Sequence, residues 1–157
     1  MNDNTCCFTG HRNLPPERIT QIKERLEKTI LHLISKGVRY FSAGGARGFD
    51  TLAAQAVLKL RSFYPHISLI LVLPCPEQAR RWSSQEQVVY EEIKMGADKI
   101  VYTSSHYYCG CMHRRNRYLV DISDCCVCYL TEKTGGTQYT VAYCRARGIP
   151  VINLADK

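Results

Sequence analysis

The chain has 157 residues, of which 45% are hydrophobic and 22% charged, and its 21 Lys and Arg outnumber its 14 Asp and Glu to give a net charge of +7. This length and composition fit one globular domain over residues 1–157 and exclude disordered, collagen-like and coiled-coil proteins. No stretch approaches the roughly 18 apolar residues of a membrane span, and no signal peptide is visible, so we expect a cytoplasmic protein without a membrane segment.

Predicted strands and helices alternate along the chain. An apolar run over 5–9 predicts the first strand, and Pro15 and Pro16 open a helix that ends before Gly37. Further strands are predicted at 38–41, 67–73, 99–102, 125–130 and 150–154. Further helices are predicted at 48–62, at 77–95 in one or two pieces, at 110–121 and at 135–147. This alternation predicts an α/β fold: a three-layer, Rossmann-like sandwich around a mostly parallel sheet of about six strands.

Nine cysteines raise the questions of disulfides and of metal binding. Their odd number, without a secretion signal, argues against a disulfide framework. The best material for a zinc site is Cys109, Cys111, Cys125, Cys126, Cys128 and His113. The C-x-C and C-C-x-C spacings of this set differ from those of structural zinc sites. Because several cysteines fall in apolar runs, where a free thiol packs as a small hydrophobic group, we expect reduced thiols and no metal.

Three glycine-bearing turns follow predicted strands, at 9–12, 42–50 and 135–137. The carboxyl ends of parallel strands share one edge of the sheet, and glycine there lets backbone N–H groups approach a phosphate at the start of a helix. One such turn also fits ordinary turn chemistry, but three at one edge favour a phosphate site. Arginine suits phosphate, although exposed arginines are also common on solvated surfaces. The predicted ligand-binding residues are Thr9, Gly10, His11, Arg12, Gly44, Gly45, Arg47, Gly48, Asp50, Arg115, Asn116, Gly135, Gly136 and Thr137.

The order of these motifs resembles the SLOG superfamily of Rossmann-like proteins, and within it the YpsA/YoqJ type. The resemblance covers nearly the whole chain, in the four segments 7–12, 44–50, 110–121 and 135–141. It implies binding of a nucleotide or a nucleotide-derived ligand, such as one like ADP-ribose or NAD, over the glycine-rich edge. It also implies pairing of two copies into a dimer.

The related LOG phosphoribohydrolases imply a second, enzymatic interpretation. Their helix motif resembles the segment 112–116, in which Arg115 matches a functional arginine. Their second motif resembles 134–140, but the glutamate that would stabilise positive charge on the ribose is missing. Asp50 or Asp121 would have to replace it, so the catalytic candidates are Arg115, Asp50 and Asp121. Without the glutamate, we expect binding rather than catalysis.

The sequence therefore favours binding or sensing of a small phosphorylated ligand, and it leaves two alternatives open. One is a LOG-like hydrolase that cleaves an N-glycosidic bond of a nucleotide derivative. The other is single-stranded nucleic-acid binding, which the net charge of +7 and a DNA-processing, DprA-type branch of the superfamily favour. Dispersed charges and the lack of a nucleic-acid-binding motif argue against it. For the preferred function, we expect Gly45→Glu to abolish binding by placing a carboxylate in the phosphate site.

Overall fold

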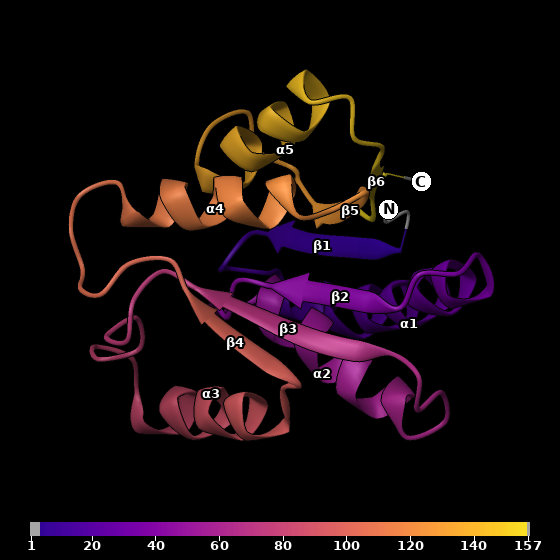
Figure 1. The fold of residues 1–157 in the computed structure, drawn as a ribbon, viewed down its shortest axis with the longest axis horizontal. Helices are drawn as coiled ribbons and strands as arrows, with labels where there is room; N and C mark the ends of the chain where they lie inside the picture. The colour runs from indigo at the N-terminus through magenta and orange to yellow at the C-terminus, as the bar shows by residue number, and fades with distance from the viewer. Residues whose placement is uncertain (1–3, 157) are drawn as a thin grey trace.

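The computed structural model describes residues 4–156 and contains one six-stranded sheet with helices on both faces (Figure 1). The strands are β1 (Thr5–Gly10), β2 (Tyr40–Ala43), β3 (Ser68–Leu73), β4 (Lys99–Tyr102), β5 (Cys125–Tyr129) and β6 (Val151–Asn153). The helices are α1 (Ile19–Ser35), α2 (Phe49–Arg61), α3 (Ser84–Gly96), α4 (Cys111–Asp121) and α5 (Gly136–Ala146). The strand order is β4-β3-β2-β1-β5-β6, and all five pairings are parallel, so the predicted three-layer α/β fold is confirmed.

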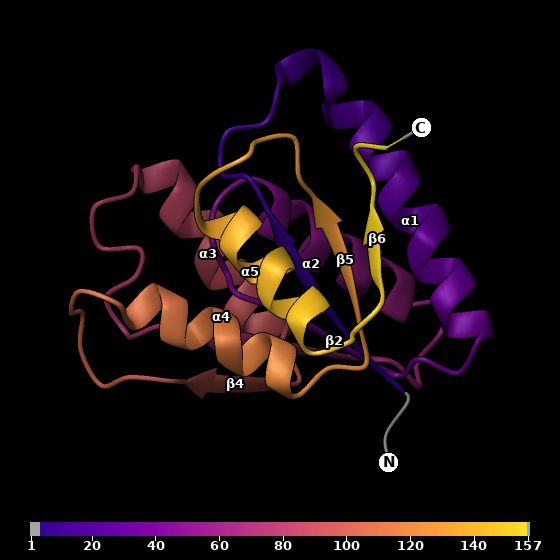
Figure 2. The same ribbon diagram turned by 90° about the horizontal axis from the view of Figure 1, so that it is seen from above.

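Side-chain alternation along the strands divides the core into two layers. Cys6 and Phe8 of β1 pack with α1 and α2, whereas Cys7 between them packs with α4 and α5. Figures 1 and 2 show the same division, with α1, α2 and α3 on one face of the sheet and α4 and α5 on the other. Because helices cover both faces, the strands carry the continuous apolar runs from which they were predicted.

Three element boundaries differ from the prediction. α1 begins at Ile19, after a 3-10 turn at Pro16–Arg18 rather than at the prolines themselves. β2 begins at Tyr40 rather than at residue 38, because the Val38 N–H still donates to the Leu33 carbonyl at the end of α1. α3 begins at Ser84, and the expected helical turns from residue 77 are separate hydrogen-bonded turns. None of the helices in residues 4–156 is long and apolar enough to cross a membrane.

The helices change face between β1 and β5. The crossovers through α1, α2 and α3 build the sheet outward from β1 to β4, and those through α4 and α5 build it in the other direction. In an open parallel sheet, ligands bind beyond the carboxyl ends of the strands on either side of such a point. A ligand is therefore expected to bind at the turns that follow β1, β2 and β5.

Candidate functional site

The turn after β1 packs directly on the turn after β2. The Phe49 N–H, at the start of α2, donates to the His11 carbonyl at 3.1 Å. Gly48 has a φ of +77°, and a Cβ there would overlap the Arg12 carbonyl oxygen. Only glycine satisfies both demands, so the sequence fixes the close approach of these two turns through Gly48.

His11 joins the turn after β1 to the loop after β5. The Thr131 N–H donates to His11 Nε2 at 2.9 Å, which leaves the ring proton of the neutral imidazole on Nδ1. The same ring meets Tyr129 edge-on, with 6.3 Å between the ring centroids. His11 thus bridges the point where the helices change face, and it positions the loop that leads into α5.

Arg115 reaches from α4 to the turn after β2, and its side chain is only 5% exposed. Its Nη1 donates to the Gly44 carbonyl, and its Nε donates to Asn116 Oδ1 at 2.8 Å. A Cβ on Gly44 would lie 2.6 Å from Arg115 Nη1, so a larger residue there would have to displace the guanidinium. Within residues 4–156, no ion pair includes Arg115, and its Nη2 donates to the Met112 sulfur at 3.8 Å. The guanidinium charge is therefore buried without a directly paired carboxylate.

Asp50 is the buried acid of the site. Burial raises its pKa from 3.8 to about 6, against the charge of Arg115 and hydrogen bonds from the backbone N–H groups of Ala46 and Gly44. Burial also lowers the pKa of Arg115, Asp50 raises it, and the nearby charge of Arg12 lowers it. Two arginines thus share this edge with one acid that is half protonated near pH 6, so the local charge is positive.

Three helices begin at this edge without a capping side chain. The N-cap residues of α2, α4 and α5 are Gly48, Gly110 and Gly135, all with positive φ. By contrast, Ser83 and Glu86 form a complete capping box at the start of α3. Apart from the adjoining residues and the backbone of α5 itself, no heavy atom of residues 4–156 lies within 4 Å of a Cβ built on Gly135 or Gly136. The start of α5 therefore offers open space beside uncapped backbone donors, which suits an anion.

Two of the predicted site residues point elsewhere. Asp121 ends α4, at the opposite end from the glycine turns, where it accepts from Tyr143 at 2.8 Å and pairs with Arg147 at 3.0 Å. Arg47 turns toward α3, where its Nη1 lies 3.6 Å from Glu86 Oε1. Each side chain thus has a partner away from the turns, and contact of either with a ligand stays a prediction.

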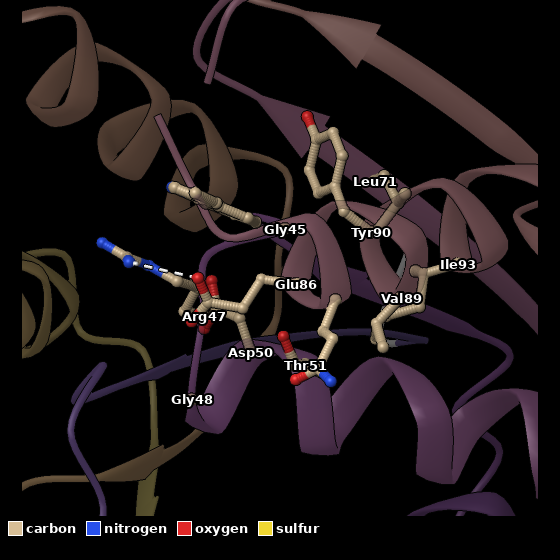
Figure 3. Close-up of a pocket in the computed structure, with 12 residues that line it drawn as sticks. Gly45, Arg47, Gly48, Asp50, Thr51, Leu71, Glu86, Val89, Tyr90 and Ile93 are labelled. Atoms are coloured by element: carbon tan, nitrogen blue, oxygen red, sulfur yellow. Dashed lines mark ion pairs between the residues drawn. The ribbon is translucent and has the colours of Figure 1, made fainter. Parts of the chain in front are cut away.

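A cavity of about 240 Å³ adjoins the turn after β2, and its lining joins the predicted Gly45, Arg47, Gly48 and Asp50 to residues of β3 and α3 that were not predicted (Figure 3). It lies between the start of α2, β3 and α3, and its walls include Trp82 and Tyr90. Gln78, also missed, is buried beside it and donates to both the Gly44 carbonyl and the Tyr90 hydroxyl at 3.4 Å. The sequence does contain a signal for this region: the capping-box pattern Ser83-x-x-Glu86 predicts that α3 starts at Ser84, and α3 forms one wall of the cavity.

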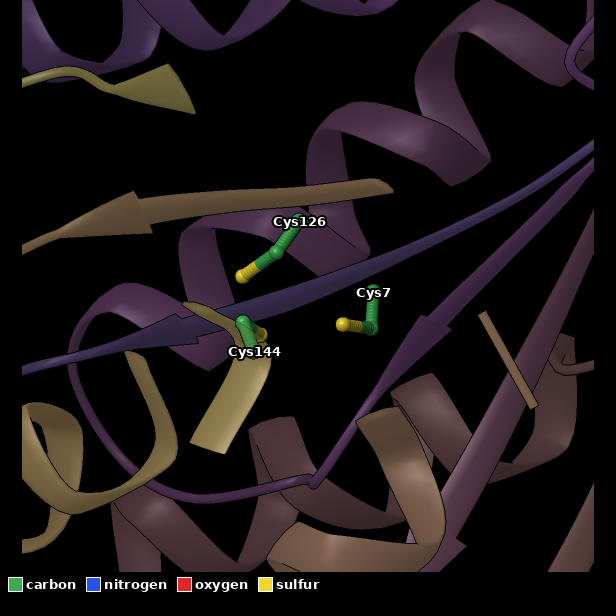
Figure 4. Close-up of side chains that lie close together, drawn as sticks. All are labelled: Cys7, Cys126 and Cys144. Carbon is green, nitrogen blue, oxygen red and sulfur yellow. The ribbon is translucent and has the colours of Figure 1, made fainter. Parts of the chain in front are cut away.

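The cysteines that lie closest together in the structure differ from the set that the sequence offered as possible zinc ligands. Among residues 4–156, which hold all nine as free thiols, the set able to surround an ion is Cys7, Cys126 and Cys144 (Figure 4). Their sulfur atoms lie within 4.8 Å of one another, and all three side chains are buried. Hydrogen bonds from the Cys126 and Cys7 thiols lower the pKa of Cys144, while burial opposes this. Three thiols without a fourth ligand fit structural zinc poorly, and the set packs within the α4 and α5 layer.

The comparisons with known proteins give the family. The YspA SLOG family model matches residues 7–148. The chain belongs to this family. UPF0398 protein BH1768 of Halalkalibacterium halodurans is 35% identical over 132 residues, which cover 82% of this chain and 70% of that protein. The SPbeta prophage-derived protein YoqJ of Bacillus subtilis, named as uncharacterised, is 28% identical over 80% of this chain and 81% of its own length.

One solved structure shares most of this fold, although its sequence differs widely from that of this chain. DNA processing protein A of Helicobacter pylori, described with a single-stranded DNA binding mode, superposes with a TM-score of 0.66 at 18% identity. The match covers 95% of this chain but only 64% of that chain. It supports the Rossmann-like architecture of the SLOG family member described here, and at this identity it shows the fold alone.

Proposed function

We propose that the protein binds a small phosphorylated ligand, a nucleotide or a nucleotide derivative, at the glycine-rich carboxyl edge of the sheet. The observation that carries this proposal is the buried Arg115, which lacks a directly paired carboxylate and lies at the same edge as the uncapped start of α5. Phosphate would accept from the open backbone donors of α5 and lie in the positive field of Arg12 and Arg115.

Binding without cleavage of the N-glycosidic bond fits the first turn of α5 better than hydrolysis. That turn contains no acidic residue, and it has Gln138 and Tyr139 after the Gly-Gly-Thr segment. Asp50 is the buried carboxylate at this edge, and it already accepts from the Ala46 N–H at 3.3 Å. Release of free base from a nucleoside monophosphate, measured by chromatography, would contradict a purely binding function.

Thermal unfolding with and without ADP-ribose tests the proposal. At 100 times Kd, a ligand stabilises the folded state by about 2.7 kcal/mol, which raises Tm by about 5–10 °C in a domain of this size. Gly136→Glu should remove this shift, because it places a carboxylate at the start of α5. The variant should still fold, since the site is open and an acid there suits the helix dipole. Gly136→Gln, of similar size but uncharged, is the matched control.

Two other results would contradict the proposal: no shift in Tm at millimolar ADP-ribose, or equal shifts in the wild type and in Gly136→Glu. Gly45→Glu, the substitution that the sequence suggests, is a poorer test. Gly45 has a φ of +71°, and a Cβ there would lie 2.5 Å from a Leu73 methyl carbon, so the variant would be strained with or without a ligand.

Single-stranded DNA offers the same phosphate chemistry and is the second candidate. The net charge of +7 and the likeness to DNA processing protein A support it. Fluorescence anisotropy of a labelled oligonucleotide at two salt concentrations separates the candidates. We expect weak, strongly salt-dependent binding that Gly136→Glu barely changes, because nonspecific attraction depends on total charge. Pairing of two copies into a dimer also stays a prediction.

A further inference from the structure

The cavity between α2, β3 and α3 adjoins the turn after β2, which belongs to the proposed phosphate site. Its volume of about 240 Å³ falls below the roughly 300–1,000 Å³ of pockets that enclose a whole ligand. A space of this size suits one ring system of a larger ligand whose remainder lies outside.

Apolar and aromatic side chains form most of the cavity wall. Val89, Tyr90 and Ile93 of α3 line the cavity together with Leu71 of β3 (Figure 3). Trp82 adds a second aromatic wall, edge-to-face with Tyr90 at 5.1 Å between ring centroids. Such a lining favours a flat ring that has apolar faces over a sugar or a second phosphate group.

The cavity shares residues with the turn after β2, one of the three turns of the proposed phosphate site. Gly45 and Gly48 of the turn after β2 and Asp50 at the start of α2 all belong to the cavity lining. Arg47 also lines the cavity, with its guanidinium carbon 5.1 Å from the centre of the Trp82 ring. Its Nε is buried and has no hydrogen-bond partner among the described residues. A ring that enters here would meet an aromatic wall and an unsatisfied donor.

We propose that this cavity receives the base of a nucleotide whose phosphate lies at the glycine turns, with the base against Trp82. The inference rests on the proposed function and narrows it, because it requires a ligand that carries both a base and a phosphate. Asp50 lies between the two parts of the site, where the ribose of such a ligand would pass.

Intrinsic fluorescence tests this directly, because Trp82 is the single tryptophan of the chain. We expect AMP to quench Trp82 emission and to bind roughly tenfold or more tightly than ribose phosphate, as the burial of one stacked base supports. Val89→Phe should fill the cavity and remove this preference while ribose phosphate still binds. Val88→Phe is the matched control, since Val88 directly precedes Val89 in α3, is 57% exposed and does not line the cavity.

The outcomes separate the two proposals. Equal binding of AMP and ribose phosphate, with unchanged Trp82 emission, would overturn the base site and leave the phosphate site standing. A preference for AMP that survives in Val89→Phe, with the fold intact by circular dichroism, would also overturn it. Binding of neither ligand would overturn the phosphate site and this inference with it.

Discussion

At the scale of single residues, Asp50 and Arg115 couple the charge of the site to its stability. The pKa of Asp50 is about 6 in the folded protein and 3.8 for an ordinary Asp. Between pH 3.8 and pH 6, the folded state therefore keeps a proton on Asp50 that the unfolded state has released. Stability contributed by this group is therefore present below pH 3.8 and is lost as the pH rises through 6. About two pKa units correspond to a loss of about 3 kcal/mol.

Asp50→Asn should remove most of this pH dependence, because the amide keeps an acceptor oxygen for the Ala46 N–H and carries no charge to bury. Urea denaturation of both proteins at several pH values between 4 and 7.5 measures the difference. We expect the free energy of unfolding to fall more steeply with pH in the wild type. Parallel curves for the two proteins would show that Asp50 is not the buried acid described here.

At the scale of elements, the sequence predicted the strands well and the start of α3 poorly. β1, β3 and β5 are buried apolar runs, and their positions follow from hydropathy alone. Residues 77–82 contain good helix formers, yet Gln78 is buried beneath Gly44, and this tertiary contact prevails over local helix propensity. The helix starts only where Ser83 caps it.

The capping box of α3 gives a direct test of that boundary. The Glu86 N–H donates to Ser83 Oγ at 3.1 Å, and the Ser83 N–H donates to Glu86 Oε1 at 2.9 Å. Ser83→Ala should lower the free energy of unfolding by about 1 kcal/mol. It should also speed hydrogen exchange at the Glu86 amide. Ser84→Ala, at the next and exposed position, should change neither, and a similar loss in both variants would contradict the assigned cap.

The parts of the site that could be predicted are those set by the backbone. Turns that follow parallel strands must share one edge, so Gly10, Gly44 and Gly135 were placed from the order of elements. Side-chain directions depend on packing between elements distant in sequence, and these were not predictable. Arg47 turns to α3 because Trp82 and Glu86 face it, and this contact spans 35 or more residues of the chain.

At the scale of the whole molecule, part of the net charge of +7 lies at one edge of the sheet. Arg12 and Arg115 bring positive charge to the edge where β1, β2 and β5 end. The three-layer fold brings His11, the turn after β2 and the start of α5 to that same edge. We therefore propose that turns from three separate parts of the chain act together as one phosphate site.

Backbone amide shifts in a proton–nitrogen NMR spectrum, recorded as ADP-ribose is added, test this claim most directly. We expect the largest shifts to fall together on the amides of residues 10–12, 44–48 and 135–138, with one shared dissociation constant. Gly136→Glu should abolish all three sets of shifts. Shifts confined to one turn, shifts centred elsewhere on the sheet, or none at millimolar ADP-ribose would contradict it.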